Sequence, residues 1–571
     1  MQLLLQRKKL DDKDKQVGIF FDRNRLSSLK SNRGVTSVKD LKSSFSAWKN
    51  LLGPEHVSDD ENTLKRLGQT TFATCQRIPA IIRPANRAQV QECLRIANHY
   101  KTPVYPISRG RNWGYGSAVP ARDGCVVMDL ARMNRIVDYD ENLAYVTLEP
   151  GVTQQQLFEF LRAQNSNLFM SATGAPPDSS LIGNILDRGL GEGPYGDRFQ
   201  YVCGMEAVLP TGDCIHTGFG RFPGAKASRV GHWGVGPYLD GLFTQSNLGV
   251  VTGMTLWLTP YPKYFQSFYY AIKEEARLAE VIDTVRDLKL NRVIETAFVI
   301  ANDFRALPLT QQYPWEQSGM KTPLPDGVRE HLRRTFLGGS LWSGTGALYS
   351  NSKAQGRVVR RLIKKALRDK VDRIVFFDAR TARLAQMQIA QSLLKRLFGF
   401  DAGAFAKFFF DKNPQRGIPI TEAAGLAYWR KRSPVPVDID PDRDRCGLIW
   451  CSPLIPFDGR HARNALGIIE AVVTAHGFEP NIGLNCATDR SIVVTVGIAY
   501  DREVPGEDRR ASDCHDRLLD KLTEAGYVPY RLSIVLRPSK FEGHCPMIRH
   551  GCRMALMVAL NWSVECVKEE S

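Results

Sequence analysis

Several features that would place this chain of 571 residues in a common class of protein are missing from its sequence. No apolar run reaches the roughly 18 residues of a membrane-spanning helix. The apolar start, Met1–Leu5, gives way to charged residues too early for a signal peptide. No HExxH, P-loop or GxSxG pattern occurs in a context that supports a zinc protease, a nucleotide hydrolase or a serine hydrolase. We therefore expect a cytoplasmic protein with some other chemistry.

Cysteine pairing is also missing. The twelve cysteines form no CxxC pair and no regular framework. Most of them, such as Cys125 and Cys451, lie in apolar runs, where a free thiol packs as a small hydrophobic side chain. This usage is typical of a reducing compartment. His544, Cys545 and Cys552 have no recognisable zinc spacing, so no metal is expected.

Positive charge is abundant but not concentrated. The chain carries 76 basic and 60 acidic residues, a net charge of +16. Its basic residues are scattered, with short clusters such as Arg357–Lys365, and no nucleic-acid recognition module accompanies them. We therefore expect no nucleic-acid partner, whereas anionic ligands or an acidic protein fit the surplus.

The length exceeds one hydrophobic core and predicts more than one domain. Glycine-rich loops fill the first half, and the composition changes near Thr259, after which strand-like runs alternate with amphipathic helices. We expect an N-terminal extension over residues 1–45, a first domain over 46–262, a second domain over 263–520, and a return to the first domain over 521–571. The helices expected in the first half are Phe45–Leu52, Asn86–Tyr100 and Thr153–Ala163, and the strands include 78–85, 125–129, 136–138 and 144–149.

The most informative stretch is Val104–Pro120, which holds three glycines, two serines, two arginines and an asparagine directly after a short β-like run. Such a segment cannot pack a core, but it can crowd backbone N–H groups into a concavity that binds phosphate oxygens. A plain turn between two strands is the alternative. Residues 171–198 and 236–252 are also rich in glycine, and long connections of this kind are unusual unless they serve a function.

The glycine-rich blocks occur together in a recognisable order. They are S-R-G-R-N-W-G-Y-G-S-A (108–118), L-I-G-N-I-L-D-R-G-L-G (181–191), P-Y-G-D (194–197) and L-D-G-L-F-T-Q-S-N-L-G-V-V-T (239–252). Over residues 70–260 the chain resembles the para-cresol methylhydroxylase-type FAD-binding domain of the vanillyl-alcohol oxidase family, and a weaker resemblance covers most of 45–540. It implies an α+β fold with a two-subdomain FAD-binding domain and an α/β cap domain that contains an antiparallel sheet.

The resemblance implies FAD as the cofactor and a small-molecule substrate, with molecular oxygen or a cytochrome as electron acceptor, and a homodimer. Hydroxyl and backbone groups of the first block would bind the pyrophosphate, and the later blocks would line the rest of the flavin. The expected cofactor-binding residues are Ser108, Arg109, Gly110, Arg111, Asn112, Gly116, Ser117, Ser180, Gly183, Asn184, Gly189, Gly191, Gly249, Val250 and Tyr428.

The family's substrate site binds a phenolate through two tyrosines and an arginine, and the matching positions here are Tyr115, Tyr530 and Arg531. A phenol titrates near 10 in water, so a fixed guanidinium and two hydroxyl donors would stabilise its anion at neutral pH. The resemblance then implies hydride transfer from the para benzylic carbon to flavin N5 through a quinone methide. The alternatives are that Tyr115 packs on the flavin and that Tyr530 and Arg531 form an ordinary strand end.

The sequence departs from the family at several positions. Ala175 stands where the oxidases have an aspartate near N5, and Glu192 stands where a tyrosine is frequent. Leu448 occupies the position of the flavin-linking histidine, which excludes that bond. Tyr428 is the remaining candidate for a covalent link, with a core aromatic as the other interpretation, so FAD is expected to be non-covalent or bound through Tyr428. The C-terminal tail lacks the family's usual ending.

Two further hypotheses stay open. The first is an oxidoreductase of the same fold whose substrate is a non-phenolic alcohol, a hydroxy acid or a biosynthetic intermediate. A protein that binds FAD or a partner without turnover is the alternative of a different class, because the N5-side acid is absent and the tail is unusual.

Overall fold

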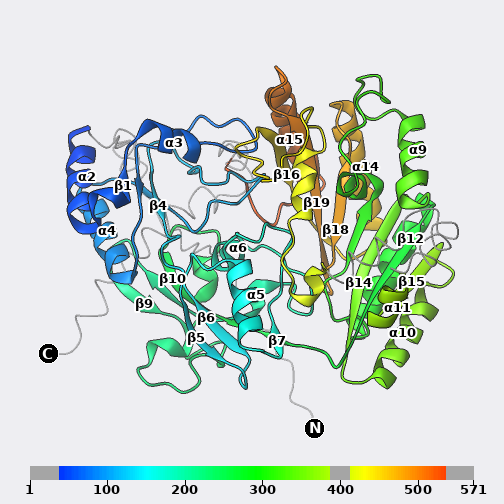
Figure 1. Ribbon diagram of the computed structural model, residues 1–571, viewed down its shortest axis with the longest axis horizontal. Coiled ribbons are helices and arrows are strands. Elements are labelled where there is room, and N and C mark those ends of the chain that lie inside the picture. The colour runs from blue at the N-terminus through cyan, green and yellow to red at the C-terminus, as the bar shows by residue number, and fades with distance from the viewer. Residues whose placement is uncertain (1–37, 386–411, 535–571) are drawn as a thin grey trace, which may run out of the picture.

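The computed structural model describes residues 38–385 and 412–534, with the N-terminal half at the left of Figure 1 and the residues after β11 at the right. Most of the expected N-terminal extension lies outside the described residues, as do His544, Cys545, Cys552 and the C-terminal tail. All nine cysteines of the described ranges are free thiols. None of the helices in these ranges is long and apolar enough to cross a membrane.

The chain begins with a small mixed sheet covered by helices. Its elements are α2 (Val38–Leu52), β1 (Val57–Ser58), α3 (Glu61–Leu67), β2 (Ile81–Ile82), α4 (Arg87–His99), β3 (Val104–Ile107) and β4 (Val126–Asp129). The strand order is β1-β2-β4-β3, in which β4 runs parallel to both neighbours. Asn86 caps α4 by accepting the amide of Gln89 at 3.0 Å. The indole of Trp48 on α2 donates to the carbonyl of Cys93 on α4 at 3.2 Å and fixes the two helices together.

A second, antiparallel sheet follows in the order β5-β6-β10-β8-β9. The elements of this part are β5 (Ile136–Asp140), β6 (Tyr145–Leu148), α5 (Gln154–Ala163), β7 (Leu168–Phe169), α6 (Leu181–Leu186), β8 (Val202–Val208), β9 (Cys214–His216), β10 (Val250–Trp257) and β11 (Thr259–Pro260). Thr153 caps α5, as the sequence predicts. The strands and α5 bury one apolar cluster that includes Val146, Leu157 and Met254.

Two expectations for this half need correction. Residues 171–198 are not structureless, because α6 forms within them and buries Leu181, Ile182 and Ile185 in the core. Ser180 caps this short helix by accepting the amide of Gly183 at 2.9 Å. The strand expected over residues 78–85 is only β2, since prolines at positions 79 and 84 remove backbone donors from both ends.

The second half is built on one large antiparallel sheet in the order β15-β12-β14-β13-β18-β19-β16, with β17 paired to β19. Its strands are β12 (Tyr264–Ile272), β13 (Val299–Asn302), β14 (Trp342–Ser350), β15 (Arg373–Phe377), β16 (Cys446–Cys451), β17 (Leu454–Pro456), β18 (Asn481–Asn485) and β19 (Ser491–Asp501). Its helices are α7 (Leu278–Leu290), α8 (Asp303–Ala306), α9 (Asp326–Leu337), α10 (Lys353–Leu367), α11 (Ala379–Ala385), α14 (Gly459–Ala475) and α15 (Glu507–Glu524).

Short 3-10 helices connect these elements. They are η2 (Pro54–His56), η3 (Arg198–Tyr201), η4 (Gly218–Arg221), η5 (Asp240–Phe243), η6 (Glu275–Arg277), η7 (Leu307–Leu309), η8 (Pro414–Arg416) and η9 (Glu422–Tyr428). The mixture of helices with largely antiparallel sheets confirms the expected α+β class. The domain boundary predicted between residues 262 and 263, directly before β12, stays a proposal.

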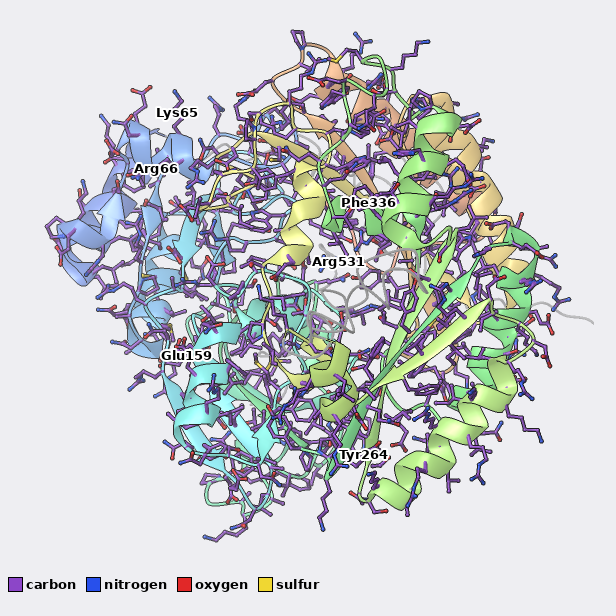
Figure 2. All side chains as sticks on the ribbon, turned by 45° about the vertical axis from the view of Figure 1, so that its right-hand side comes forward. Lys65, Arg66, Glu159, Tyr264, Phe336 and Arg531 are labelled. Atoms are coloured by element: carbon purple, nitrogen blue, oxygen red, sulfur yellow. The ribbon has the colours of Figure 1, made fainter. Side chains whose placement is uncertain are left out.

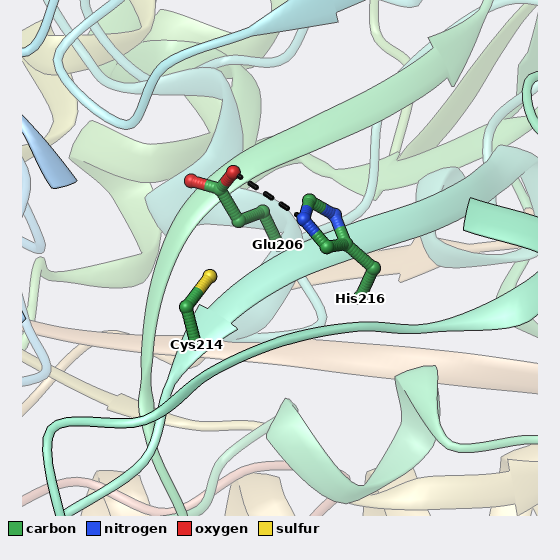
Figure 3. A group of neighbouring side chains, drawn as sticks. All are labelled: Glu206, Cys214 and His216. Carbon is green, nitrogen blue, oxygen red and sulfur yellow. Dashed lines mark ion pairs between the residues drawn. The ribbon is translucent and has the colours of Figure 1, made fainter. Parts of the chain in front are cut away.

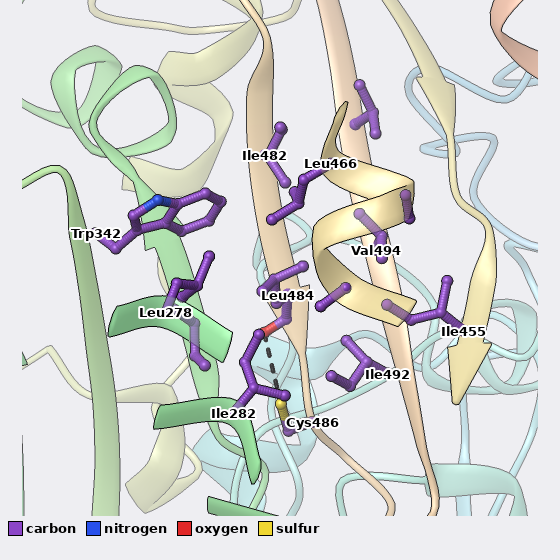
Figure 4. Packing of buried hydrophobic residues seen from close by; sticks show 14 of the residues in the cluster. Leu278, Ile282, Trp342, Ile455, Leu466, Ile482, Leu484, Cys486, Ile492 and Val494 are labelled. Carbon is purple, nitrogen blue, oxygen red and sulfur yellow. Dashed lines mark hydrogen bonds between the residues drawn. The ribbon is translucent and has the colours of Figure 1, made fainter. Parts of the chain in front are cut away.

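The large sheet has two different faces. Helices α7, α10, α14 and α15 cover one face and bury Leu278, Ile363, Leu466 and Leu518 against Ile482 and other residues of the central strands. Figure 4 shows part of this core, with Leu278, Ile282 and Leu466 around β18 and Val494. Ile449 and Cys451 of β16 belong to this core. Because side chains alternate along a strand, Leu448, Trp450 and Ser452 point to the opposite face. That second face bears the residues described next.

Candidate functional site

The glycine-rich loop after β3 lies against the strand end of β16. Gly110, Gly114 and Gly116 have φ values of 64°, 78° and 127°, and Ser117 has 51°. Left-handed conformations turn successive N–H groups toward one side of the loop. In the described ranges, no protein acceptor pairs with the backbone N–H of Gly110, Arg111 or Asn112. The loop therefore offers free donors at its tip.

The second glycine-rich block packs directly on this loop. A Cβ added to Gly183 would lie 3.2 Å from the hydroxyl of Ser108, so the close approach requires a small residue there. The amide of Asn112 donates to the carboxylate of Asp187 at 2.6 Å. Arg111 pairs with Asp178 at 2.9 Å, and Arg109 donates to the carbonyl of Asp178. Asn184 accepts the guanidinium of Arg198 at 2.7 Å, beside Gly189 and Gly191.

The last glycine-rich block, residues 239–252, lies against the second block. The backbone N–H of Gln245 donates to the carbonyl of Leu186 at 2.9 Å, and the side-chain amide of Gln245 donates to the backbone carbonyl of Asp187 at 3.3 Å. Gly249 lies where a Cβ would be 2.9 Å from the carbonyl of Val208, and Val250 begins β10 beside it. The structure thus brings the blocks 108–118 and 239–252 into contact with the block 181–191.

This assembly fits an FAD pyrophosphate. Unpaired backbone donors in a tight loop are expensive unless an acceptor reaches them, and a phosphate supplies several oxygens. The loop residues Gly110, Arg111 and Asn112 would hold the phosphates, and the guanidinium of Arg109 lies at the same loop. Gly183 and Asn184 would line the continuation of the cofactor. These individual assignments remain predictions.

An acidic segment, residues 438–444, lies on the other side of the loop. Arg111 pairs with Asp440 at 2.6 Å, and the hydroxyl of Ser117 donates to Asp442 at 2.9 Å. Burial raises the pKa of Asp442 to about 7. The backbone N–H of Ser117 donates to the carbonyl of Asn112 at 3.1 Å, so both donors of Ser117 are engaged by protein and neither is free for a phosphate in this structure.

Tyr428 connects to this acidic segment. Its ring is buried with Leu426, Cys446 and Leu448, and its hydroxyl donates to Asp444. Burial, followed by the Asp444 carboxylate, raises the pKa of Tyr428 above its ordinary value. These surroundings are those of a core aromatic, and they leave the covalent link a prediction.

The three residues expected at the phenol site lie together at the junction of the two halves. The guanidinium carbon of Arg531 lies 3.6 Å from the ring centroid of Tyr115 and 5.7 Å from that of Tyr530. Figure 2 shows Arg531 between the two parts of the molecule. The backbone N–H of Tyr530 donates to the backbone carbonyl of Ser452 at 3.1 Å, and the backbone N–H of Ile534 donates to the backbone carbonyl of Tyr115 at 3.3 Å. The bend at Tyr530 and Arg531, near the C-terminal end of the described chain, and the N-terminal glycine-rich loop thereby form one cluster.

The electrostatics of this cluster favour a positive charge. Burial works against the guanidinium of Arg531, but the oxygens of Tyr115, Tyr530 and Asp187 outweigh it and raise its pKa. Burial raises the pKa of Tyr530 by more than Arg531 lowers it, so this phenol stays protonated and can donate. A fixed cation and a protonated hydroxyl are the groups that stabilise a bound phenolate.

Two members of the cluster were not among the predicted site residues. Asp187 lies 3.5 Å from Arg531 and also accepts the amide of Asn112, so it joins the phenol cluster to the cofactor loop. Ser452 lies 2.8 Å from the hydroxyl of Tyr115. Asp187 lies in the glycine-rich block 181–191 and Ser452 follows Cys451, but only the folded contacts between distant segments reveal their partners.

The family's N5-side acid has no direct substitute at Ala175, whose carbonyl accepts a hydrogen bond from Gln154. Glu192 is half-buried, its backbone N–H donates to Ala172, and burial raises the pKa of its carboxyl to about 7. Glu192 lies close enough to Tyr349 of β14 for its charge to raise the pKa of that phenol. Glu192 therefore lies near the large antiparallel sheet of the second half, called the cap sheet below. Its carboxyl group can bind a proton near neutral pH.

A separate group of possible metal ligands lies on the second sheet. Figure 3 shows Glu206, Cys214 and His216, whose ligand atoms lie within 4.8 Å of one another. Arg87 pairs with the same Glu206 carboxylate at 3.0 Å. Because a guanidinium already neutralises this carboxylate, we interpret the group as a surface ion-pair network.

Comparison with known proteins identifies flavoproteins of similar sequence and fold. A family model described as an FAD binding domain matches residues 78–218. A 1'-carboxy-chondrochloren decarboxylase of Chondromyces crocatus is 46% identical over 498 residues, which cover 87% of this chain and 91% of that protein. The flavoprotein subunit of a 4-cresol dehydrogenase (hydroxylating) of Pseudomonas putida is 28% identical, covering 90% of this chain and 92% of that protein. The structure of a p-cresol methylhydroxylase with substrate bound matches with a TM-score of 0.78 at 26% identity, covering 91% of this chain and 96% of that chain.

The fold and the site together define a flavin-dependent oxidoreductase. The chain belongs to the para-cresol methylhydroxylase-type family of vanillyl-alcohol oxidase flavoproteins, and FAD is its cofactor. The expected two-subdomain FAD-binding domain with an antiparallel cap sheet is confirmed. The alternative of a binding protein without turnover does not agree with this membership.

Proposed function

We propose that the protein oxidises a para-substituted phenol, of the 4-alkylphenol or 4-hydroxybenzyl alcohol type. The observation that carries this proposal is the stacking of Arg531 on Tyr115 at 3.6 Å with Tyr530 beside it. Two phenol hydroxyls and a guanidinium converge from distant segments of the chain. This set suits a phenolate oxygen better than an aliphatic alcohol, which remains neutral at any physiological pH.

The roles of the residues follow from their surroundings. Arg531 neutralises the substrate oxygen, and Tyr530 and Tyr115 donate hydrogen bonds to it. Ser452 orients Tyr115, and Asp187 orients Arg531. Ionisation of the phenol raises electron density at the para carbon, which makes loss of a benzylic hydride easier. FAD, when bound, supplies the two-electron acceptor for this oxidation.

The remaining expectations belong to the same proposal. The physiological electron acceptor is molecular oxygen or a cytochrome, and the protein is a homodimer. FAD is held without a covalent bond, because the hydroxyl of Tyr428 already donates to Asp444 within a buried cluster.

Anaerobic mixing with 4-ethylphenol or 4-hydroxybenzyl alcohol tests the function. The proposal predicts bleaching of the yellow holoenzyme by these phenols and no bleaching by glycolate, lactate or benzyl alcohol. If the hydroxy acids bleach the flavin and the phenols do not, the oxidoreductase acts on non-phenolic substrates and the proposal is wrong.

A second candidate is oxidation coupled to loss of a carboxyl group. A relative with 46% identity is named a decarboxylase of a carboxylated compound. For this chain the candidate requires that a substrate carry a carboxylate near the oxidised carbon. Release of carbon dioxide during anaerobic bleaching by a carboxylated phenol would support it.

A further inference from the structure

Arg305 is a cation beside the phenol cluster that has no role in the function described so far. It belongs to α8 and is half-buried on the face of the large sheet opposite to α7, α10, α14 and α15. Its guanidinium carbon lies 4.9 Å from the ring centroid of Trp450, and its Nη1 donates to Asn481 at 3.2 Å. Asn481 in turn donates to the carbonyl of Phe304 at 2.8 Å, so the side chain of Arg305 is held in place.

This guanidinium has no carboxylate partner. Within residues 38–385 and 412–534, no acidic side chain approaches Arg305 to within 4.0 Å. Nearby arginines differ, because Arg329 pairs with Asp303 at 2.7 Å and Arg430 pairs with Glu479 at 2.8 Å. Burial lowers the pKa of Arg305 to about 10, so it stays charged at neutral pH. An unpaired, partly buried charge is costly unless a ligand compensates it.

The position of Arg305 links it to the phenol cluster. The indole N–H of Trp450 donates to the carbonyl of Trp113 at 3.1 Å, and its backbone N–H donates to Gly114 at 3.2 Å. Trp450 therefore contacts the two residues that precede Tyr115 while its ring supports Arg305. Arg305 is also close enough to Tyr115 for the two groups to interact electrostatically.

The sheet leaves space for these two large side chains. Gly483 and Gly497 lie on the same face of β18 and β19. A Cβ at Gly483 would be 3.6 Å from Nε of Arg305, and one at Gly497 would be 3.0 Å from the indole of Trp450. Because both positions lack a side chain, Arg305 and Trp450 can pack directly against these two strands.

We infer that Arg305 binds a carboxylate on the para side chain of the substrate, while Arg531 binds the phenol oxygen at its other end. This inference rests on the proposed phenol oxidation. The substrate class is then a 4-hydroxyphenylalkanoate or a larger compound with the same two anionic groups. The unpaired charge of Arg305 and its fixed orientation support this assignment, and Trp450 lies between Arg305 and the loop that carries Tyr115. The decarboxylase name of one relative agrees with a carboxylated substrate.

The test compares 3-(4-hydroxyphenyl)propanoate with 4-propylphenol, which has a methyl group in place of the carboxylate. Anaerobic rapid mixing of the holoenzyme gives the dissociation constant and the limiting rate of flavin bleaching for each compound. In Arg305→Leu, the dissociation constant of the acid is expected to rise roughly 30-fold or more, since breaking a desolvated charge pair costs about 2 kcal/mol or more. The constant for 4-propylphenol is expected to stay within about threefold of its wild-type value.

Matched variants separate binding from folding. Arg305→Lys keeps the charge and should restore part of the affinity for the acid, and Arg305→Gln keeps a donor to Asn481 if the leucine variant fails to fold. Arg360→Leu is the control, because Arg360 also lies over an aromatic ring, 5.1 Å from the centroid of Phe376, on helix α10. It should change neither constant.

The outcomes distinguish the two proposals. The inference about Arg305 is wrong if 4-propylphenol bleaches the wild type but the acid binds no more tightly than 4-propylphenol. It is also wrong if Arg305→Leu binds both compounds like the wild type. In both cases the phenol function stands. Equal weakening of both compounds in Arg305→Leu and Arg305→Gln would assign Arg305 a structural role and also overturn the inference. If neither compound bleaches the wild type, phenol oxidation itself fails.

Discussion

The hydroxyl of Tyr115 lies 2.8 Å from the hydroxyl of Ser452, although the two residues are 337 positions apart. This contact joins the glycine-rich loop of the FAD-binding part to the end of strand β16 in the cap sheet. One hydroxyl is therefore positioned by both halves of the molecule. The site exists only when the two halves are docked.

Replacement of Ser452 by alanine tests whether this contact orients Tyr115. A typical neutral hydrogen bond contributes about 1 kcal/mol, so the affinity for 4-ethylphenol should fall roughly fivefold. Ser318→Ala is a suitable control, because Ser318 lies outside the phenol cluster. Ser318 is also buried, and its hydroxyl donates to the carbonyl of Trp315 at a distance of 2.9 Å. Unchanged affinity in Ser452→Ala, with Tyr115→Phe still impaired, would show that Tyr115 needs no support from β16.

The glycine-rich loop makes a second prediction, at Gly114. Its φ is 78°, and an added Cβ would lie 2.1 Å from Cδ1 of Trp450. Gly114→Ala combines backbone strain of about 1–2 kcal/mol with overpacking of about 1–3 kcal/mol. Thermal unfolding and the flavin content of the purified protein should both decrease.

Gly124→Ala is the matched control for that variant. Gly124 has a φ of 77°, and an added Cβ there meets nothing within 4 Å. It should show the backbone cost alone and retain FAD. Equal effects of the two substitutions would mean that contact between the loop and Trp450 does not matter for the cofactor.

Glu192 predicts a pH dependence of stability. Burial raises its pKa from 4.5 to about 7 in the folded protein. The folded state then binds a proton at Glu192 more tightly than the unfolded state does. The contribution of Glu192 to the free energy of unfolding therefore falls as pH rises from about 4.5 to about 7. Glu192→Gln should be more stable than the wild type at pH 8 by about 1–3 kcal/mol, and the gain should shrink at pH 5.

Urea unfolding at the two pH values measures this difference. Glu295→Gln serves as the control, because Glu295 is exposed on the surface. Asp442 also has a raised pKa and adds its own pH dependence, so the comparison must use the difference between variant and wild type. A gain that is the same at both pH values would contradict a buried, neutral Glu192.

The attachment of FAD gives a simple prediction about Tyr428. Because the Tyr428 hydroxyl donates to Asp444 inside a buried cluster, acid precipitation should release all the flavin into the supernatant. Tyr428→Phe should keep its FAD and lose only some stability. A yellow pellet from the wild type and a colourless one from Tyr428→Phe would establish the covalent link instead.

Much of the fold could be predicted because its signals are local. The helices predicted over Asn86–Tyr100 and Thr153–Ala163 follow from local signals in the sequence, and the structure caps them at Asn86 and Thr153. Helix α6 could not be predicted in this way, because its six residues, with a glycine and an asparagine inside, are helical only through burial of Leu181 and Ile185.

The site was only partly predictable for a related reason. Tyr115, Tyr530 and Arg531 were found through resemblance to a family, and the structure brings them together. Ser452 lies 337 positions from Tyr115, Asp187 lies 344 positions from Arg531, and Arg305 meets the distant Trp450. No periodicity or spacing in the sequence predicts such pairs. Serine, aspartate and arginine are common residues whose roles depend on their neighbours in space.

The central claim is that Arg531 and Tyr530 hold a phenolate in front of the flavin, and anaerobic bleaching by 4-ethylphenol tests it most directly. Wild-type protein and Tyr527→Phe should be bleached at similar rates, since the Tyr527 hydroxyl contacts only His461 and Asn464 among the described residues. Tyr530→Phe should slow bleaching about 10-fold or more and Arg531→Ala about 100-fold or more, with FAD retained, because each removes a group that stabilises the anion. Bleaching at the wild-type rate in both flavin-loaded variants would contradict the account.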